Sequence, residues 1–149
     1  MISVGRPAPE VTLLTDAGPV SLASLAGQKV VLFFFPKAAT PGCSIEARGF
    51  REAWAGFQAK GVIVFGVSRD PARRQATWKQ KECFPFGFVS DESGEVCEAF
   101  GAWREKSLYG RKYMGVARIT ALIDEAGVVA QVWDPVKAAG HAEQVLAAL

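Results

Sequence analysis

Residues 30–50 read VVLFFFPKAATPGCSIEARGF, and this stretch decides the fold. Its first six residues are all apolar, which is typical of a β-strand that is covered on both faces of a sheet. Pro36 ends the strand, and a loop rich in proline and glycine follows. Because an amphipathic pattern starts at Cys43, the segment predicts a central strand that delivers a cysteine to the first turn of a helix.

The helix that follows is predicted over residues 43–60. Four apolar residues at steps of three, four and three form one stripe along it. They are Ala47, Phe50, Trp54 and Phe57. Gly61 is a suitable stop for this helix.

Before this segment, the sequence predicts a β-hairpin. Residues 11–14 form a short β-type run, Asp16-Ala17-Gly18 can make a turn, and residues 20–21 can return. A brief helical turn is expected over residues 22–26.

After it, strands and helices alternate. Strands are predicted at residues 62–67 and 86–89, and helices at residues 71–82 and 96–100, with Asp70 capping the first and Pro71 at its first position. Residues 102–115 are expected to form a long surface loop. Residues 119–123 and 128–133 are predicted to pair as a hairpin, and an amphipathic helix closes the chain at residues 142–149.

This order of elements indicates an α/β fold. The βαβ units require parallel pairing, and the two hairpins add antiparallel strands. We therefore expect a thioredoxin-like fold, with a central mixed sheet flanked by helices on both faces and an N-terminal β-hairpin.

Composition narrows the functional classes. The chain has 149 residues, of which 50% are hydrophobic and 21% charged, and its net charge is +2. This length suits one domain, residues 1–149, whose core needs no disulfide framework. The near balance of charge argues against a nucleic-acid binder. One histidine cannot supply the usual two or three histidines of a metal site, so no metal is expected.

The protein is expected to be cytoplasmic, without a membrane segment. The sequence MISVGRPAPE does not resemble a secretory signal, and the longest run of aliphatic and aromatic residues is far shorter than the roughly 20 residues of a spanning helix. The three cysteines, Cys43, Cys83 and Cys97, form no C-x-x-C pair. In a reducing compartment such cysteines are buried, bind metals or react.

Cys43 is the candidate reactive residue, because free N–H groups and the helix dipole at a helix start favour a thiolate. Thr40, three residues earlier, can place a hydroxyl beside the sulfur. Glu46, three residues later, can orient a neighbouring group. The alternative is that Cys43 is a buried first-turn residue that acts only as a small hydrophobe.

The motif P-x-x-x-T-x-x-C, filled here by Pro36, Thr40 and Cys43, resembles the peroxidatic motif of peroxiredoxins. The string FFFPKAATPGCSIEARGFR is similar to the bacterioferritin-comigratory protein, or peroxiredoxin Q, subgroup, which typically shows YFYPK and TPGCT-x-E-A. The resemblance continues through VSDESGEVCEAFGAWREKSLYG and GVARITALIDEAG and covers nearly the whole chain.

The resemblance implies that no metal or organic cofactor is needed, and it implies a role for each matching residue. Cys43 is then the peroxidatic cysteine, whose thiolate attacks a peroxide and becomes a sulfenic acid. The Thr40 hydroxyl bonds the peroxide and the thiolate, and Pro36 shields the sulfur from water. Arg118 matches an arginine that enters from a distant strand, where a cation would stabilise the thiolate and the leaving oxygen. Glu46 matches the family pattern as an orienting residue. Without the resemblance, Arg118 would be assigned to an ordinary salt bridge at a strand edge.

The chain departs from the family at the resolving cysteine. Many members carry it five residues after the first cysteine, where this chain has Arg48, and others near the position of Lys79. Cys83 lies one helical turn beyond Lys79 and is a candidate resolving thiol in a shifted position. The alternative that we favour is that Cys83 is buried at the helix end. Cys97 is expected to pack in the core, and His141 to be exposed or to cap the last helix.

The leading hypothesis is a thiol-dependent peroxidase that reduces hydrogen peroxide and organic hydroperoxides. A 1-Cys cycle is expected, with thioredoxin, glutaredoxin or a small thiol as reductant; if Cys83 resolves Cys43, thioredoxin would reduce the disulfide. A dithiol oxidoreductase would need a second cysteine at Glu46. A third class is a non-enzymatic redox sensor. The small size favours a monomer, and a dimer stays open.

Overall fold

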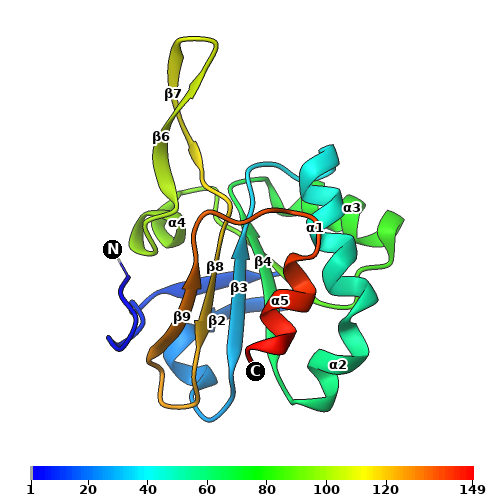
Figure 1. Ribbon diagram of the computed structural model, residues 1–149, viewed down its shortest axis with the longest axis vertical. Coiled ribbons are helices and arrows are strands. Elements are labelled where there is room, and N and C mark those ends of the chain that lie inside the picture. Colours follow the sequence, from blue (N-terminus) through cyan, green and yellow to red (C-terminus); the bar gives the residue numbers. More distant parts are fainter. Residues whose placement is uncertain (1) are drawn as a thin grey trace.

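The computed structural model describes residues 2–149, and most of its strands belong to one sheet (Figure 1). The strands of this sheet are β1 (Thr12–Thr15), β2 (Gly18–Ser21), β3 (Val30–Phe34), β4 (Ile63–Ser68), β5 (Gly87–Ser90), β8 (Ile119–Ile123) and β9 (Val129–Trp133). Their order across the sheet is β2-β1-β5-β4-β3-β8-β9.

The sheet is mixed, as the sequence predicts. Strand β3 runs parallel to β4, and β4 runs parallel to β5. On its other edge β3 pairs with β8 in the antiparallel sense, and β8 pairs likewise with β9. The N-terminal hairpin of β1 and β2 joins the sheet through β5. This is the thioredoxin-like arrangement with an N-terminal hairpin that the sequence led us to expect.

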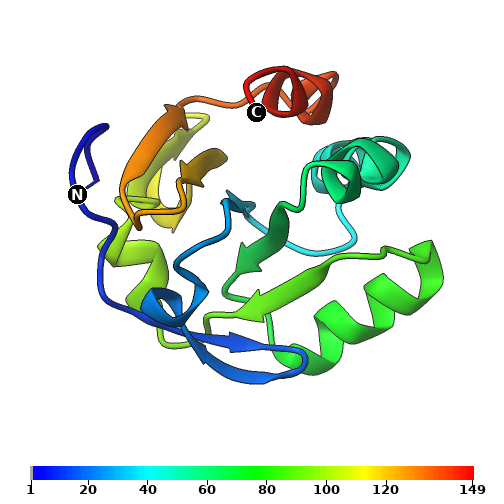
Figure 2. The same ribbon diagram turned by 90° about the horizontal axis from the view of Figure 1, so that it is seen from below.

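Helices cover both faces of the sheet (Figure 2). They are α1 (Pro41–Glu52), α2 (Trp54–Ala59), α3 (Ala72–Glu82), α4 (Glu95–Ala99) and α5 (His141–Ala147), with a short 3-10 turn at Leu22–Leu25. Helices α1, α2, α3 and α5 lie on one face, and α4 and the 3-10 turn lie on the other. None of the helices within residues 2–149 has the length and apolar character needed to span a bilayer.

All five residues of β3 are buried, so alternate side chains enter the two cores. On the α1 side the ring of Phe33 stacks on Phe50, with centroids 4.5 Å apart. A Cβ at Gly66 on β4 would lie 2.8 Å from the Phe33 ring and 2.7 Å from Phe88, so glycine makes room for both rings. This packing holds α1 against β3 and thereby places the start of the helix.

The helix predicted over residues 43–60 is two helices in the structure. Helix α1 ends at Glu52, the backbone turns at Ala53, and α2 begins at Trp54. The predicted stripe is still buried on the sheet side except for Trp54, which is partly buried. The apolar stripe therefore continues from α1 to α2, because both helices pack on the same core.

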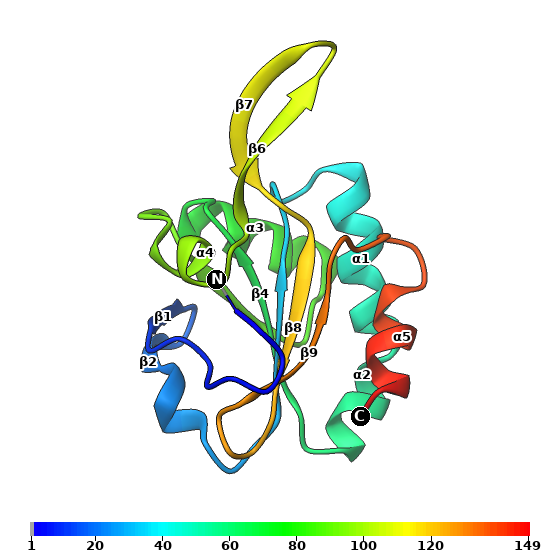
Figure 3. The same cartoon turned by 60° about the vertical axis from the view of Figure 1, so that its left-hand side comes forward.

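The long surface loop predicted at residues 102–115 is wrong. Residues in this region form the hairpin of β6 (Trp103–Leu108) and β7 (Arg111–Val116), which projects away from the main sheet (Figure 3). Tyr109 and Gly110 at its tip have φ of 51° and 75°, the left-handed values that a two-residue hairpin turn requires. Most side chains of the hairpin are exposed, so its sequence lacks the apolar alternation that identifies a strand.

The expectation that Asp70 caps the next helix is also wrong. The residue at the N-cap position of α3 is Pro71, and no side chain caps this helix. The Asp70 carboxylate instead accepts a hydrogen bond from the backbone N–H of Ala38, at 2.7 Å. The carboxylate therefore binds a backbone group that is 32 residues away in the chain and does not cap the adjacent helix.

Candidate active site

Strand β3 leads through the loop of residues 35–40 directly into α1, as predicted. Thr40 is the N-cap residue of α1, and Cys43 is the third residue of the helix. The first helical bond runs from the N–H of Ser44 to the carbonyl of Thr40, so the N–H groups of Gly42 and Cys43 precede the bonded part of the helix. Cys43 is only 1% exposed. The cysteine therefore lies at the positive end of a twelve-residue helix, in a nearly closed environment.

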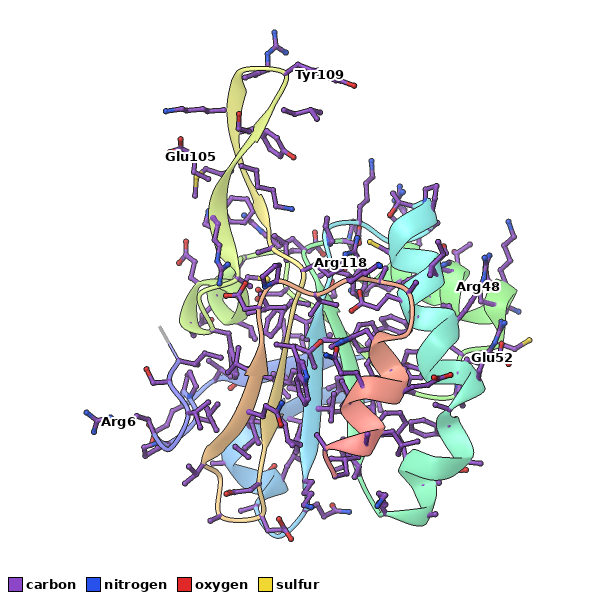
Figure 4. The ribbon with its side chains drawn as sticks, in the orientation of Figure 1. Arg6, Arg48, Glu52, Glu105, Tyr109 and Arg118 are labelled. Atoms are coloured by element: carbon purple, nitrogen blue, oxygen red, sulfur yellow. The ribbon has the colours of Figure 1, made fainter. Side chains whose placement is uncertain are left out.

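Arg118 brings a cation to this cysteine. Its Nη2 lies 3.5 Å from the Sγ of Cys43. The two residues are 75 positions apart in the chain, but β3 pairs with β8 so that Phe34 faces Ile119, and Arg118 immediately precedes Ile119. Figure 4 shows Arg118 at the end of the sheet nearest the start of α1. The structure thus brings together two of the residues that the sequence suggested for the site.

Glu46 holds the other side of the same guanidinium. Its Oε1 accepts a hydrogen bond from Arg118 Nη1 at 2.8 Å, and the side chain is fully buried. A Cβ at Gly42 would lie 3.2 Å from Arg118 Nη2, so glycine leaves room for the guanidinium. Gly42 was not singled out from the sequence, although its place directly before Cys43 was a usable signal.

The buried ion pair shifts both pKa values. Burial raises the pKa of Glu46 to about 7, although the charge and hydrogen bond of Arg118 act in the opposite direction. Burial lowers the pKa of Arg118, but the negative charges of Cys43 and Glu46 outweigh this and raise it. Glu46 Oε2 is buried and has no hydrogen-bond partner within residues 2–149. The guanidinium therefore stays charged, and the carboxyl group is the member of the pair that titrates.

A second cation, Lys106 on β6, was missed by the sequence analysis. Burial and the charge of Arg118 lower its pKa, whereas the charge of Cys43 raises it. Lys106 lines an open groove of about 570 Å³ that also contacts Pro36, Lys37 and Tyr113. The charge of Cys43 thus acts on a lysine of the hairpin, and no local pattern in the sequence could have signalled this.

The Thr40 hydroxyl does not bond the sulfur in this structure. It donates a hydrogen bond to the carbonyl oxygen of Lys37, at 2.7 Å. With its hydrogen engaged, the oxygen presents only lone pairs, so it is an acceptor for an incoming O–H group. Pro36 follows β3 and lines the groove beside Lys37 and Lys106.

Cys83 is exposed, so the expectation that it is buried at the helix end is wrong. It follows α3 with a left-handed φ of 57°. The preceding Glu82 is bound to α1, because Arg48 donates two hydrogen bonds to its carboxylate and Arg51 donates one to its carbonyl. Figure 4 shows Arg48 on the outer side of α1, away from Arg118.

Cys83 consequently lies beside the later turns of α1. Residues 48 and 51 follow Cys43 by five and eight positions, which is about 8–12 Å along a helix axis at 1.5 Å per residue. All three cysteines are free thiols. Contact between Cys43 and Cys83 therefore requires the backbone to move.

Cys97 is fully buried in the second core, as predicted. Burial and the neighbouring Asp91 raise the pKa of its thiol well above the usual value. The Asp91 carboxylate also accepts hydrogen bonds from the N–H groups of Val96 and Cys97. Cys97 is therefore a packing residue whose thiol stays protonated. The free N–H groups at the start of its helix are bound by Asp91.

The prediction for His141 is wrong, because the residue is 1% exposed. Its Nε2 shares a hydrogen bond of 2.7 Å with the Thr120 hydroxyl, and its ring meets Phe50 and Trp133 edge to face. Burial lowers the pKa of His141 below its usual value. It joins α5 to β8 in the neutral form, and none of the hydrogen bonds or ring contacts described for it involves a cysteine. No group of three histidine, cysteine, aspartate or glutamate residues within residues 2–149 is arranged to hold a metal ion.

Comparison with known proteins agrees with this geometry. Residues 4–132 match the AhpC/TSA family. The chain is 46% identical over 149 residues to a putative peroxiredoxin bcp of Coxiella burnetii, covering 99% of both chains. It is 39% identical over 146 residues to peroxiredoxin Bcp of Escherichia coli K12, covering 97% of this chain and 94% of the relative.

Two solved structures are similar over almost their whole length. The Xanthomonas campestris bacterioferritin comigratory protein, studied for its alkyl peroxide reduction activity, has a TM-score of 0.90 at 35% identity, covering 98% of this chain and 96% of the other. A cysteine-to-serine mutant of PrxQ from Xylella fastidiosa has a TM-score of 0.93 at 31% identity, covering 99% and 95%.

Proposed function

The chain belongs to the AhpC/TSA family and, within it, to the Bcp or PrxQ peroxiredoxins, so it is a thiol-dependent peroxidase, and we propose that Cys43 is its peroxidatic residue. The observation that carries the assignment is the 3.5 Å contact between Arg118 Nη2 and the sulfur of a buried cysteine at a helix start. Neither of the other two thiols has a cation in hydrogen-bond contact with its sulfur within residues 2–149.

The reaction begins with the Cys43 thiolate and a peroxide ROOH. The sulfur attacks one peroxide oxygen, the O–O bond breaks, and the other oxygen leaves as an alkoxide or hydroxide that takes up a proton. The products are the sulfenic acid of Cys43 and an alcohol or water. Hydrogen peroxide and organic hydroperoxides both fit this chemistry.

Arg118 and Thr40 contribute to this reaction in different ways. The Arg118 guanidinium stabilises the thiolate and the negative charge that develops on the leaving oxygen. Thr40, whose own hydrogen is bound by the Lys37 carbonyl, accepts a hydrogen bond from the peroxide O–H. Glu46 orients Arg118 through the 2.8 Å ion pair, and Pro36, in the loop that precedes the helix start, shields the sulfur from water.

We propose a 1-Cys cycle for the return to the thiol. An external thiol attacks the sulfenic sulfur, water leaves, and a mixed disulfide forms; a second thiol then releases Cys43 as the reduced thiol. The two arginine contacts to Glu82 support this cycle, because they hold Cys83 beside the later turns of α1. The reductant is thioredoxin, glutaredoxin or a small thiol, and the working unit is a single domain that acts as a monomer.

The alternative is a 2-Cys cycle in which Cys83 resolves Cys43. The exposure of Cys83 favours this alternative, since an exposed thiol at a helix end can move at little cost. Its disulfide would form with loss of water from the sulfenic acid, and thioredoxin would reduce it.

Intact mass and thiol counting after one equivalent of peroxide separate the two cycles. A 1-Cys cycle leaves one thiol fewer and one added oxygen, which a sulfenic-acid probe captures. A 2-Cys cycle leaves two thiols fewer, no added oxygen and no dimer on a non-reducing gel. Under the 1-Cys cycle, Cys83→Ser should show the same loss of one thiol and the same added oxygen as the wild-type chain. Cys97→Ser serves as the matched control at a buried thiol.

The peroxidatic assignment has its own test. Cys43→Ser should abolish peroxide consumption with a dithiol reductant, while Cys83→Ser and Cys97→Ser retain it. Peroxide consumption that survives Cys43→Ser would refute the assignment. A wild-type protein that is oxidised once and does not turn over with any reductant would instead support a redox sensor.

A further inference from the structure

The loop between β3 and α1 is held by two charged residues that belong to a different part of the chain. Asp70 follows β4, and its Oδ2 accepts the N–H of Ala38 at 2.7 Å. Arg74 lies on the first turn of α3, and its Nη2 donates to the carbonyl oxygen of Ala38 at 3.1 Å. The two side chains form an ion pair with each other at 3.4 Å. Both polar groups of one residue in the loop are therefore bound by one ion pair.

This pair is itself firmly placed. The Asp70 carboxylate also accepts a hydrogen bond from the Ser68 hydroxyl at 2.8 Å, and the Asp70 side chain is only 8% exposed. Ser68 in turn accepts a hydrogen bond from the buried amide of Gln75, and the Ser90 hydroxyl donates to the Asp70 carbonyl. These bonds connect the loop to β4, β5 and α3.

The loop needs such support because its conformation is not one that the chain adopts easily. Ala38 is fully buried, and Ala39 has a φ of 66°, which is unfavourable for a residue with a Cβ. The next residue is Thr40, whose hydroxyl is turned towards the Lys37 carbonyl within the same loop. A shift of this loop would move the Thr40 hydroxyl, because its hydrogen-bond partner belongs to the same loop.

We propose that Asp70 and Arg74 are positioning residues for the peroxidase reaction, which hold residues 37–40 so that the Thr40 hydroxyl lies correctly for the peroxide. This inference rests on the proposed function of Cys43. The Asp70 carboxylate is directed to the loop, and α3 begins without a side-chain cap.

The proposal predicts a selective defect. Placement of Thr40 affects the reaction with peroxide, in which an O–H group must be bound and aligned. Alkylation by iodoacetamide needs the thiolate but no such alignment, and the thiolate is stabilised by Arg118 and the helix start, which Asp70 does not contact. Loss of the pair should therefore slow oxidation of Cys43 far more than its alkylation.

The test compares Asp70→Ala and Asp70→Asn with the wild-type chain. The second-order rate constant for Cys43 oxidation is measured by stopped flow with hydrogen peroxide and with cumene hydroperoxide. We expect Asp70→Ala to be slower by about 10- to 100-fold, the range that a misplacement of about 1 Å produces. Iodoacetamide alkylation should change by less than about 3-fold. Asp70→Asn keeps an acceptor for the Ala38 N–H and should recover most of the rate.

Asp134→Ala is the matched control, because it removes an ion pair of similar size, with Arg104, that does not touch the loop. It should leave both reactions unchanged. Amide exchange of residues 37–40, followed by mass spectrometry, reports the loop directly and should accelerate in Asp70→Ala but not in the control.

Three results would overturn the proposal: unchanged exchange in the loop, an unchanged oxidation rate, or equal losses in oxidation and alkylation, the last of which indicates general damage. If Asp70→Ala does not fold, Arg74→Met replaces it, since it removes the contact to the Ala38 carbonyl and leaves the Asp70 bond in place. A wild-type protein that does not react with peroxide would refute the proposed function, and the amide exchange alone would then decide whether the pair holds the loop.

Discussion

Replacement of Glu46 by glutamine removes the carboxyl group that titrates in the active site while it keeps the shape of the side chain. Burial raises the pKa of Glu46 from 4.5 to about 7, so the folded state binds this proton more tightly than the unfolded chain. The resulting stabilisation is complete below about pH 4.5 and is lost as the pH rises through about 7. Glutamine has no such proton, so the variant should escape the loss.

The magnitude follows from these two pKa values. The linkage relation gives a change of about 2–3 kcal/mol in the contribution of Glu46 to the free energy of unfolding between about pH 5 and about pH 8. Over this range the wild-type chain should therefore lose about that much stability relative to Glu46→Gln. The prediction concerns how the difference in free energy of unfolding between the two proteins changes with pH. Any effect of the substitution that does not vary with pH cancels.

Urea unfolding at the two pH values measures this difference. Both proteins carry Cys43→Ser, so that the thiol is not oxidised during the measurement. Glu82→Gln is the control: the hydrogen bond from Arg48 lowers the pKa of Glu82 below 4.5, so its difference from the parent chain should stay nearly flat above pH 5. If Glu46→Gln gives an equally flat difference, Arg118 keeps Glu46 ionised throughout, and our reasoning about burial is wrong.

Three further substitutions have clear expected outcomes. Arg118→Met should slow Cys43 oxidation by about 10²-fold or more, as loss of one donor to a developing negative charge does elsewhere, and stopped-flow oxidation that stays within a few fold of wild type would contradict this. Lys106→Gln should slow the same step by about 2- to 5-fold at low salt, and the difference should vanish in high salt if the lysine acts through its charge. His141→Ala should lower the free energy of unfolding by about 3 kcal/mol, because it leaves a cavity and strands the Thr120 hydroxyl; a loss under about 1 kcal/mol in urea unfolding would show that α5 repacks.

Features that depend on neighbours in the chain could be predicted from the sequence. The buried strand β3, the loop after it and the helix start at Cys43 lie within one continuous segment, and each has a local signature. The mixed sheet followed from the order of the elements, since parallel and antiparallel connections differ in length. The burial of Cys97 was predicted from the apolar helix around it.

Features that depend on distant partners could not be predicted in this way. The contact of Arg118 with Cys43 depends on the register of β3 and β8, and only the resemblance to a family suggested it. Asp70 has the sequence context of a helix cap, but a loop 32 residues earlier receives its carboxylate. His141 is polar and lies at a helix start, yet Thr120 and the surrounding rings bury it. In each case the sequence contains the residue but gives no indication of the distant partner that it contacts.

The hairpin of β6 and β7 shows a different limit. Its strands are defined by their pairing with each other, and Tyr109 at its tip is almost completely exposed. A strand without a buried face carries no periodic apolar signal, so the sequence analysis predicted a loop here.

The separation of Cys43 and Arg118 in the chain also sets when the site can first exist. During synthesis at roughly 5–20 residues per second, their separation of 75 positions corresponds to about 4–15 s. Throughout that interval the new chain carries the thiol without its guanidinium, and β8 must emerge and pair with β3 before the two meet. On the proposed role of Cys43, rapid reaction with peroxide therefore becomes available only late in synthesis, after β8 has paired with β3.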